Sequence, residues 1–110
     1  MSAEIFAHLS SPEALLPAIV QDAQSKEVLM LAWVNSEALK KTIETRRATF
    51  WSRSRNQLWT KGETSGNLQE IVNISFDCDV DSLLFSVQSH GPACHTGERT
   101  CFYRQIDLSS

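Results

Sequence analysis

The residues best suited to chemistry are three cysteines, Cys78, Cys94 and Cys101, with His95 directly after the second. Free cysteines are often buried as small apolar residues. Here glycine and proline flank Cys94 and predict turns, which display a side chain rather than bury it. Three cysteines cannot all pair with one another, so we interpret them as metal ligands rather than as a disulfide framework.

Three thiolates suit Zn²⁺ in tetrahedral geometry and leave a fourth position for water. A closed structural site normally uses four protein ligands, so the open position indicates catalysis. His95 could complete a closed site, but its adjacency to Cys94 makes ligation by both residues awkward. We therefore predict that His95 is an acid or base beside the metal. The alternative is a histidine held by local backbone hydrogen bonds.

A second candidate metal site consists of Asp77, Asp79 and Asp81. On an extended chain, alternate side chains project to the same side, and like charges held that close need a cation. An EF-hand is excluded because Ser82 stands where that loop needs glycine and Gln88 where it needs glutamate. Hard oxygen ligands favour Mg²⁺, which often serves phosphorylated substrates. The alternative is an acidic surface turn.

The same alternation directs Cys78 to the face opposite its aspartate neighbours. Zinc and magnesium would then bind on separate surfaces. One site can use both metals only if ligands converge from a folded-back segment or from two chains. A site shared by a dimer is therefore one hypothesis.

Basic and hydroxyl side chains predict a phosphorylated ligand. Guanidinium groups and hydroxyls bind phosphate well, and a glycine loop adds backbone N–H donors. The candidates are Ser52, Arg53, Ser54, Arg55, Lys61, Thr64, Ser65, Gly66 and Arg99. The alternative for the basic segment is a solvated face. Trp33, Trp51 and Trp59 could stack a base, but we favour packing in the core for these residues.

Several strands and one helix must position these residues. Apolar runs at 17–22 and 28–33 predict one hairpin, and runs at 48–52 and 58–60 predict another. Asn35 as an N-cap and an apolar stripe predict a helix from 36 to about 44.

Further strands are predicted at 68–76, 83–88 and 101–106, and Ser11-Pro12 resembles the start of a short helix. The pattern predicts a β-rich, mostly antiparallel α+β fold with one main helix, as a single domain over residues 1–110.

Composition disfavours several classes of protein. The net charge of −3 argues against a nucleic-acid partner, including RNA bound through Arg53 and Arg55. No apolar run is long enough to cross a membrane or to form a signal-peptide core. We therefore expect a cytoplasmic protein with no membrane partner.

These segments resemble the phosphoribosyl-AMP cyclohydrolase family over about residues 16–103. The motifs that carry the resemblance are LPAIVQD at 16–22, VLMLAW at 28–33, SRSR at 52–55, LW at 58–59, KGETSG at 61–66, DCDVD at 77–81, GPACHTG at 91–97 and CFY at 101–103. Agreement at so many places in this order makes the resemblance specific.

The resemblance implies an intertwined homodimer with a curved sheet that uses Zn²⁺ and Mg²⁺. Its reaction would be hydrolysis of the N1–C6 bond of 1-(5-phosphoribosyl)-AMP in histidine biosynthesis. The three cysteines would bind zinc in a site assembled across the dimer, and the three aspartates would bind magnesium. Many relatives continue the glycine loop with histidine, whereas Asn67 follows Gly66 here. Few residues follow Tyr103, so we expect this one step alone.

In this interpretation zinc would activate a water for attack at C6, with His95 as the base, and either charged His95 or a bound water as the acid for the departing N1. The alternative is a non-catalytic, zinc-stabilised nucleotide-binding module. In that case the metal would only close the loop between Cys94 and Cys101.

Overall fold

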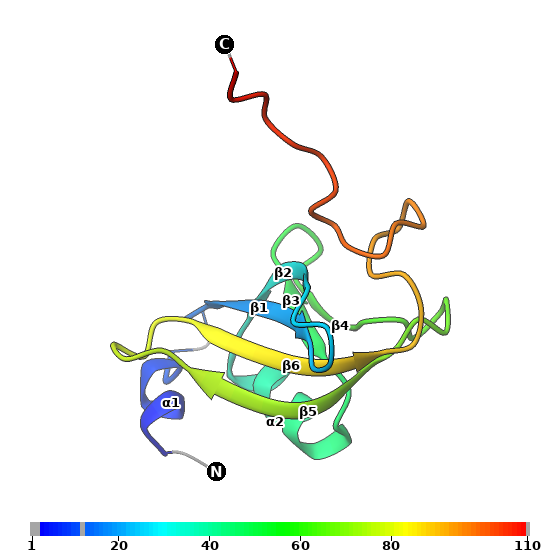
Figure 1. The fold of residues 1–110 in the computed structure, drawn as a ribbon. Coiled ribbons are helices and arrows are strands. Elements are labelled where there is room, and N and C mark those ends of the chain that lie inside the picture. Colours follow the sequence, from blue (N-terminus) through cyan, green and yellow to red (C-terminus); the bar gives the residue numbers. More distant parts are fainter. Residues whose placement is uncertain (1–2, 12, 110) are drawn as a thin grey trace.

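The strands form two sheets in the computed structural model, which describes residues 3–11 and 13–109 (Figure 1). The larger sheet has the order β2-β1-β6-β5, made of β1 (Leu16–Asp22), β2 (Val28–Val34), β5 (Gln69–Phe76) and β6 (Leu83–Ser89). The smaller sheet pairs β3 (Thr49–Ser52) with β4 (Gln57–Thr60). The helices are α1 (Ala3–His8) and α2 (Ser36–Thr45).

The β1–β2 hairpin confirms the first pair of predicted strands. Its turn is fixed by the Asp22 carboxylate, which accepts backbone hydrogen bonds from Gln24 and Ser25, each at 2.9 Å. The Asp22 N–H also donates to the Glu27 carbonyl at 2.9 Å, which closes the turn. A short side chain that satisfies turn N–H groups explains why the chain reverses here.

Helix α2 confirms the predicted main helix. The Asn35 side chain accepts from the Ala38 N–H at 2.8 Å, the expected N-cap bond. The helix ends at Arg46, whose left-handed backbone (φ 62°) lets its N–H donate to the Thr42 carbonyl.

The direction of one strand pair differs from the sequence-based prediction. Strands β1–β2, β5–β6 and β3–β4 pair antiparallel, but β1 and β6 run parallel, with Ala18 opposite Leu83 and Asp22 opposite Val87. The fold is therefore α+β with a mixed sheet. Alternating burial shows which face of a strand is inside, but it carries no information on strand direction.

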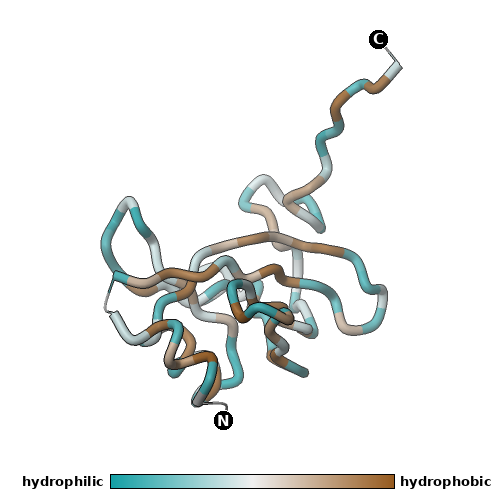
Figure 2. Tube along the Cα trace, turned by 90° about the vertical axis from the view of Figure 1, so that its left-hand side faces the viewer, coloured by the Kyte–Doolittle hydropathy of each residue, from teal (hydrophilic) through white to brown (hydrophobic). Residues whose placement is uncertain are grey.

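The buried side chains gather into one cluster between the sheets and α2. Phe50 of β3 lies at its centre, with its ring centroid 4.9 Å from Trp59 and 5.9 Å from Phe85 of β6. Phe50 therefore ties the small sheet to the large one. Figure 2 shows hydrophobic residues along the strands and hydrophilic residues in the connecting loops.

Two predicted elements are wrong. Residues 101–106 form no strand, and the segment leads away from the sheets with Phe102 and Ile106 exposed (Figure 1). No helix begins at Ser11 or Glu13, and Pro12 lies outside the described residues. The first helix is α1 instead; its Ile5 joins the core together with Leu9, the residue that follows it. In the described part of the chain, no helix has the length and apolarity needed to cross a bilayer.

Replacing Phe50 by Ala should lower the free energy of unfolding by about 3–5 kcal/mol, because it removes a large ring from a filled core. Val72→Ala is the control, since Val72 is 61% exposed on β5. Urea unfolding followed by circular dichroism measures both. Equal losses in the two variants would show that Phe50 does not join the sheets.

Candidate functional site

Cys94 and Cys101 lie together in the irregular segment that follows β6. Each thiol contributes to the pKa shift of the other, so the two side chains lie close together. The loop between them is closed by two backbone hydrogen bonds, from Cys94 to the Glu98 carbonyl at 3.2 Å and from Gly97 to the Cys94 carbonyl at 3.0 Å. The structure thus brings together two of the three cysteines predicted as zinc ligands.

The free edge of β2 holds this loop in place. The Cys101 N–H donates to the Leu29 carbonyl at 2.7 Å. The neighbouring Thr100 hydroxyl donates to the Val28 carbonyl, also at 2.7 Å. Strand β2 is an edge strand, and Leu29 is skipped in the β1–β2 register at a bulge, so its carbonyl is available to the loop.

The two thiols differ in acidity. The Thr96 hydroxyl donates to Cys94 Sγ at 3.0 Å and is the main reason that the pKa of Cys94 is lowered. Partial burial raises the pKa of Cys101, and the neighbouring Cys94 adds to the rise. The positive charge of Lys61 lowers the pKa of both thiols. Lys61 of the glycine loop, a predicted phosphate ligand, is therefore near enough for its charge to act on both thiols.

Cys78 lies at the other end of β6, in the turn that joins β5 to β6 (Figure 1). A strand of seven residues is about 20 Å long. Within residues 3–11 and 13–109, Cys78 forms no metal-sized group with Cys94 and Cys101. A single copy of the chain therefore supplies two thiols at one place and the third at another.

The three aspartates converge as predicted, although by a different geometry. Oxygen atoms of Asp77, Asp79 and Asp81 lie within 4.8 Å of one another. The segment is a turn rather than an extended strand, with Val80 buried and in the left-handed region (φ 58°). The explanation by alternation along an extended chain is therefore wrong.

Hydrogen bonds organise this acidic turn around Asp77. Its Oδ1 accepts from the Asp81 N–H at 2.8 Å, and its Oδ2 accepts from the Ser82 hydroxyl at 2.9 Å. The interaction between the carboxyl groups of Asp77 and Asp81 is the main reason that the pKa of Asp77 is lowered and that of Asp81 is raised. One of these adjacent carboxyl groups has a lowered pKa and the other a raised pKa, as expected when like charges lie close together. Such a cluster of carboxylate oxygens is the kind of ligand set that a hard cation binds.

Asn67 links the glycine loop to the turn before Cys94. A Cβ on Gly62 (φ 79°) would lie 2.2 Å from the Asn67 carbonyl carbon, and one on Gly91 would lie 2.2 Å from Asn67 Oδ1. Gly62 is therefore required for the close approach of the Asn67 backbone, whereas at Gly91 the positive φ (127°) is the stronger reason for glycine. The sequence showed Asn67 only as a departure from the family motif, and its packing role was not predicted.

The other predicted phosphate ligands lie on two exposed turns. In the turn after β3, the Ser52 hydroxyl accepts from the Arg55 N–H at 3.2 Å, and the Arg53 guanidinium lies 4.6 Å from the centre of the Trp33 ring. Thr64, Ser65 and Gly66 are exposed in the glycine loop.

The tryptophans only partly follow the prediction of core packing. Trp59 packs against the core. Trp33 and Trp51 are half-buried and line an open cavity together with Ser52 and Arg53. Their rings therefore remain accessible from solvent.

Arg99 and His95 both lie on the loop between the cysteines, in different settings. The Arg99 guanidinium pairs with Glu27 and, at 3.4 Å, with Asp22, so its charge is already compensated. His95 is exposed and directly follows Cys94 in the chain.

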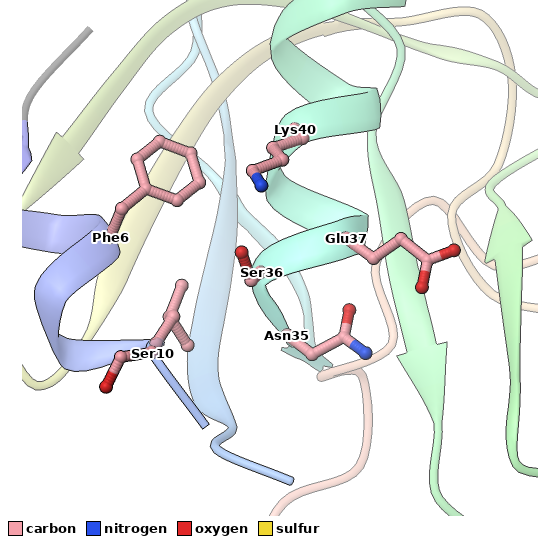
Figure 3. A pocket seen from close by; sticks show the side chains of 7 residues that line it. Phe6, Ser10, Asn35, Ser36, Glu37 and Lys40 are labelled. Atoms are coloured by element: carbon pink, nitrogen blue, oxygen red, sulfur yellow. The ribbon is translucent and has the colours of Figure 1, made fainter. Parts of the chain in front are cut away.

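Another cavity lies between α1 and α2 (Figure 3). Phe6, Ser10, Asn35 and Lys40 are among its lining residues, and Lys40 Nζ lies 5.8 Å from the centre of the Phe6 ring. None of the residues predicted for the functional site lines it.

Comparison with known proteins gives one consistent result. A family model described as phosphoribosyl-AMP cyclohydrolase matches residues 30–103. A Thermobifida fusca protein named phosphoribosyl-AMP cyclohydrolase is 58% identical over 100 residues, covering 90% of this chain and 86% of the relative. One of the same name from Archaeoglobus fulgidus is 56% identical over 95 residues, covering 86% and 88%. The Thermus thermophilus histidine biosynthesis bifunctional protein HisIE is 57% identical over 94 residues, covering 86% of this chain and 44% of the relative.

Gly62→Ala should destabilise the protein more than Gly66→Ala, because both have positive φ but only Gly62 faces the Asn67 backbone. The change at Gly66 should cost about 1–2 kcal/mol of backbone strain alone. Urea unfolding of the two variants gives the comparison. Equal destabilisation would mean that the Gly62–Asn67 approach is not required by the fold.

Proposed function

The chain belongs to the phosphoribosyl-AMP cyclohydrolase family, and from this we propose that it opens the adenine ring of 1-(5-phosphoribosyl)-AMP by hydrolysis of the N1–C6 bond. The product is the phosphoribosyl-formimino carboxamide ribotide, and the step belongs to L-histidine biosynthesis. The observation that carries the proposal is the loop that brings Cys94 and Cys101 together at the edge of β2, within range of the charge of Lys61. That arrangement puts candidate metal ligands next to a candidate phosphate ligand.

We propose that zinc is held by Cys94 and Cys101 of one copy and by Cys78 of a second copy in a homodimer. The soft thiols suit zinc, and the lowered pKa of Cys94 favours the thiolate that a metal binds. The length of β6 between Cys78 and the other two thiols supports sharing between copies. When bound, zinc would supply a Lewis acid that lowers the pKa of a water molecule.

A homodimer would also cover apolar side chains that one copy leaves in water. Val28 and Leu31 of β2 are exposed, and so are Phe102 and Tyr103 directly after Cys101. These residues adjoin the docked cysteine loop, because Cys101 is bonded to Leu29. Exposed apolar residues that border a site are typical of an interface.

Asp77, Asp79 and Asp81 are the proposed magnesium ligands. Their oxygens already lie close together at the surface, with Asp77 favouring its charged form. Mg²⁺ keeps several waters and binds phosphate oxygens as well as carboxylates. This turn would therefore hold the ion against the substrate. Arg53, Arg55, Lys61 and the hydroxyls of the glycine loop would bind the remaining phosphate oxygens.

The imidazole of His95 carries the proton transfers in this proposal. It takes a proton from the water whose oxygen bonds to C6, and it returns a proton to N1 as the N1–C6 bond breaks. Its exposed position beside Cys94 supports this role. Asn67 has no comparable capacity, since an amide does not act as a base at neutral pH.

Purified protein supplied with Zn²⁺ and Mg²⁺ should convert phosphoribosyl-AMP to a ring-opened product, seen as a change in ultraviolet absorbance and identified by mass. Removal of zinc with a chelator should abolish turnover, and added Zn²⁺ should restore it. A folded, zinc-loaded protein that leaves the substrate intact would instead indicate the non-catalytic nucleotide-binding module.

His95→Ala should lower kcat by about 10²–10⁴-fold, because a positioned acid and base is lost. Its zinc content should remain that of the unchanged protein, since His95 is not a proposed ligand. Cys101→Ala should lose zinc and activity together. Full activity in His95→Ala would exclude His95 as the proton carrier.

Asp77→Asn and Asp79→Asn should both weaken Mg²⁺ activation, whereas only Asp77→Asn should lower the urea midpoint of the metal-free protein. Asp77 accepts the hydrogen bonds that build the turn from Asp81 and Ser82. Mg²⁺ titration of activity and urea unfolding separate the two roles. An unchanged Mg²⁺ requirement in both variants would argue against this magnesium site.

A further inference from the structure

We propose that Arg99 is a positioning residue, which clamps the cysteine loop (residues 93–101) to the β1–β2 hairpin and so sets the geometry of the thiol pair. The inference rests on the proposed function, since it takes Cys94 and Cys101 as metal ligands. It replaces the prediction that Arg99 binds phosphate.

The guanidinium of Arg99 joins two carboxylates of the hairpin. Its Nε donates to Glu27 Oε1, and its Nη2 lies 3.4 Å from Asp22 Oδ2. Asp22 is the last residue of β1, and Glu27 directly precedes β2. The planar fork of an arginine can contact both carboxylates at once, which a lysine ammonium cannot do in the same way.

The hairpin end of the clamp is rigid. Asp22 Oδ1 accepts the Gln24 and Ser25 N–H groups, while Oδ2 faces Arg99. The side chain of Asp22 is only 14% exposed. Hydrogen bonds from the turn, chiefly from Ser25, lower the pKa of Asp22, and the charge of Arg99 lowers it further. The turn thus holds the Asp22 carboxylate in place independently of its contact with Arg99.

The loop end of the clamp is close to both thiols. The Arg99 carbonyl accepts the Ala93 N–H at 3.1 Å, directly before Cys94. Two positions later, Cys101 is bonded to β2 through Leu29. The Arg99 backbone therefore joins the segment before Cys94 to the segment before Cys101, while its side chain reaches the hairpin.

The loop has no regular secondary structure, so its shape depends on individual hydrogen bonds and ion pairs. Residues 95–99 are exposed, and the segment after β6 contains no helix or strand up to residue 109. Zinc–ligand distances must be held to within about 0.2 Å. A loop without regular structure meets that demand only if hydrogen bonds and side-chain contacts restrict it. Loss of a group that orients a metal ligand commonly lowers metal affinity by about 10–100-fold.

A phosphate role for Arg99 would require its release from both carboxylates. Arg53 and Arg55 are exposed on another turn and are not engaged in the ion pairs that hold Arg99. An anion would bind more readily to an uncompensated guanidinium than to one already neutralised by Asp22 and Glu27.

The direct test compares Arg99→Met, Arg99→Lys and the control Arg47→Met in the full-length protein. Arg47 is exposed and lies outside the predicted site. Zinc affinity is measured by competition with a chromogenic chelator, and KM and kcat at saturating zinc. We expect zinc affinity to fall by about 10–100-fold in Arg99→Met, to recover partly in Arg99→Lys, and to stay unchanged in Arg47→Met. KM for the nucleotide should stay near that of the unchanged protein once zinc is saturating.

Exchanging the charges of Arg99 and Glu27 distinguishes loss of this ion pair from a general folding defect. Arg99→Glu alone should weaken zinc binding, and Arg99→Glu combined with Glu27→Arg should restore part of it.

Unchanged zinc affinity in Arg99→Met with a raised KM would overturn the positioning role in favour of phosphate binding. If the unchanged protein binds no zinc while it still turns over phosphoribosyl-AMP, the zinc assignment and the positioning role both fail but the reaction stands. Absence of turnover with zinc bound tightly would contradict the proposed function alone.

Discussion

The hydrogen bond from Cys101 to the Leu29 carbonyl is the contact on which the candidate site depends. It uses the free edge of β2, where an unpaired carbonyl would otherwise face water. Thr100 and Arg99 add a second and a third attachment to the same hairpin. A chain segment without helix or strand is thereby held beside a sheet, and the two thiols acquire a defined place.

The position of β6 determines what one copy of the chain can do. Strand β6 lies between β1 and β5. The acidic turn with Cys78 precedes this strand, and the chain that follows the strand leads to Cys94. A strand is too stiff to bring these ends together. The proposed homodimer resolves the separation, because the acidic turn of one copy can face the thiol pair of the other. Activity would then depend on assembly, as in other proteins whose stability and function are tied to protomer concentration.

Much of the fold could be predicted from local sequence signals. The Asn35 cap and the apolar stripe located α2, and alternating apolar residues located the six strands of the structure. The parallel pairing of β1 with β6 could not be predicted, because it is chosen by the packing of distant segments. The apolar residues at 101–106 resembled a strand, but they have no partner strand in the described chain. The aspartates were predicted to converge for the wrong geometric reason. The ion pair between Arg99 and Glu27 spans 72 positions and had no local signal.

The central claim is that a working zinc site combines Cys94 and Cys101 of one copy with Cys78 of another. Mixing and refolding of Cys78→Ser with Cys94→Ser, each inactive alone, tests it most directly. A shared site predicts recovery of about a quarter of the activity, since random pairing gives half heterodimers with one intact site each. A mixture that stays as inactive as its components, with heterodimers shown to form, would contradict the shared site.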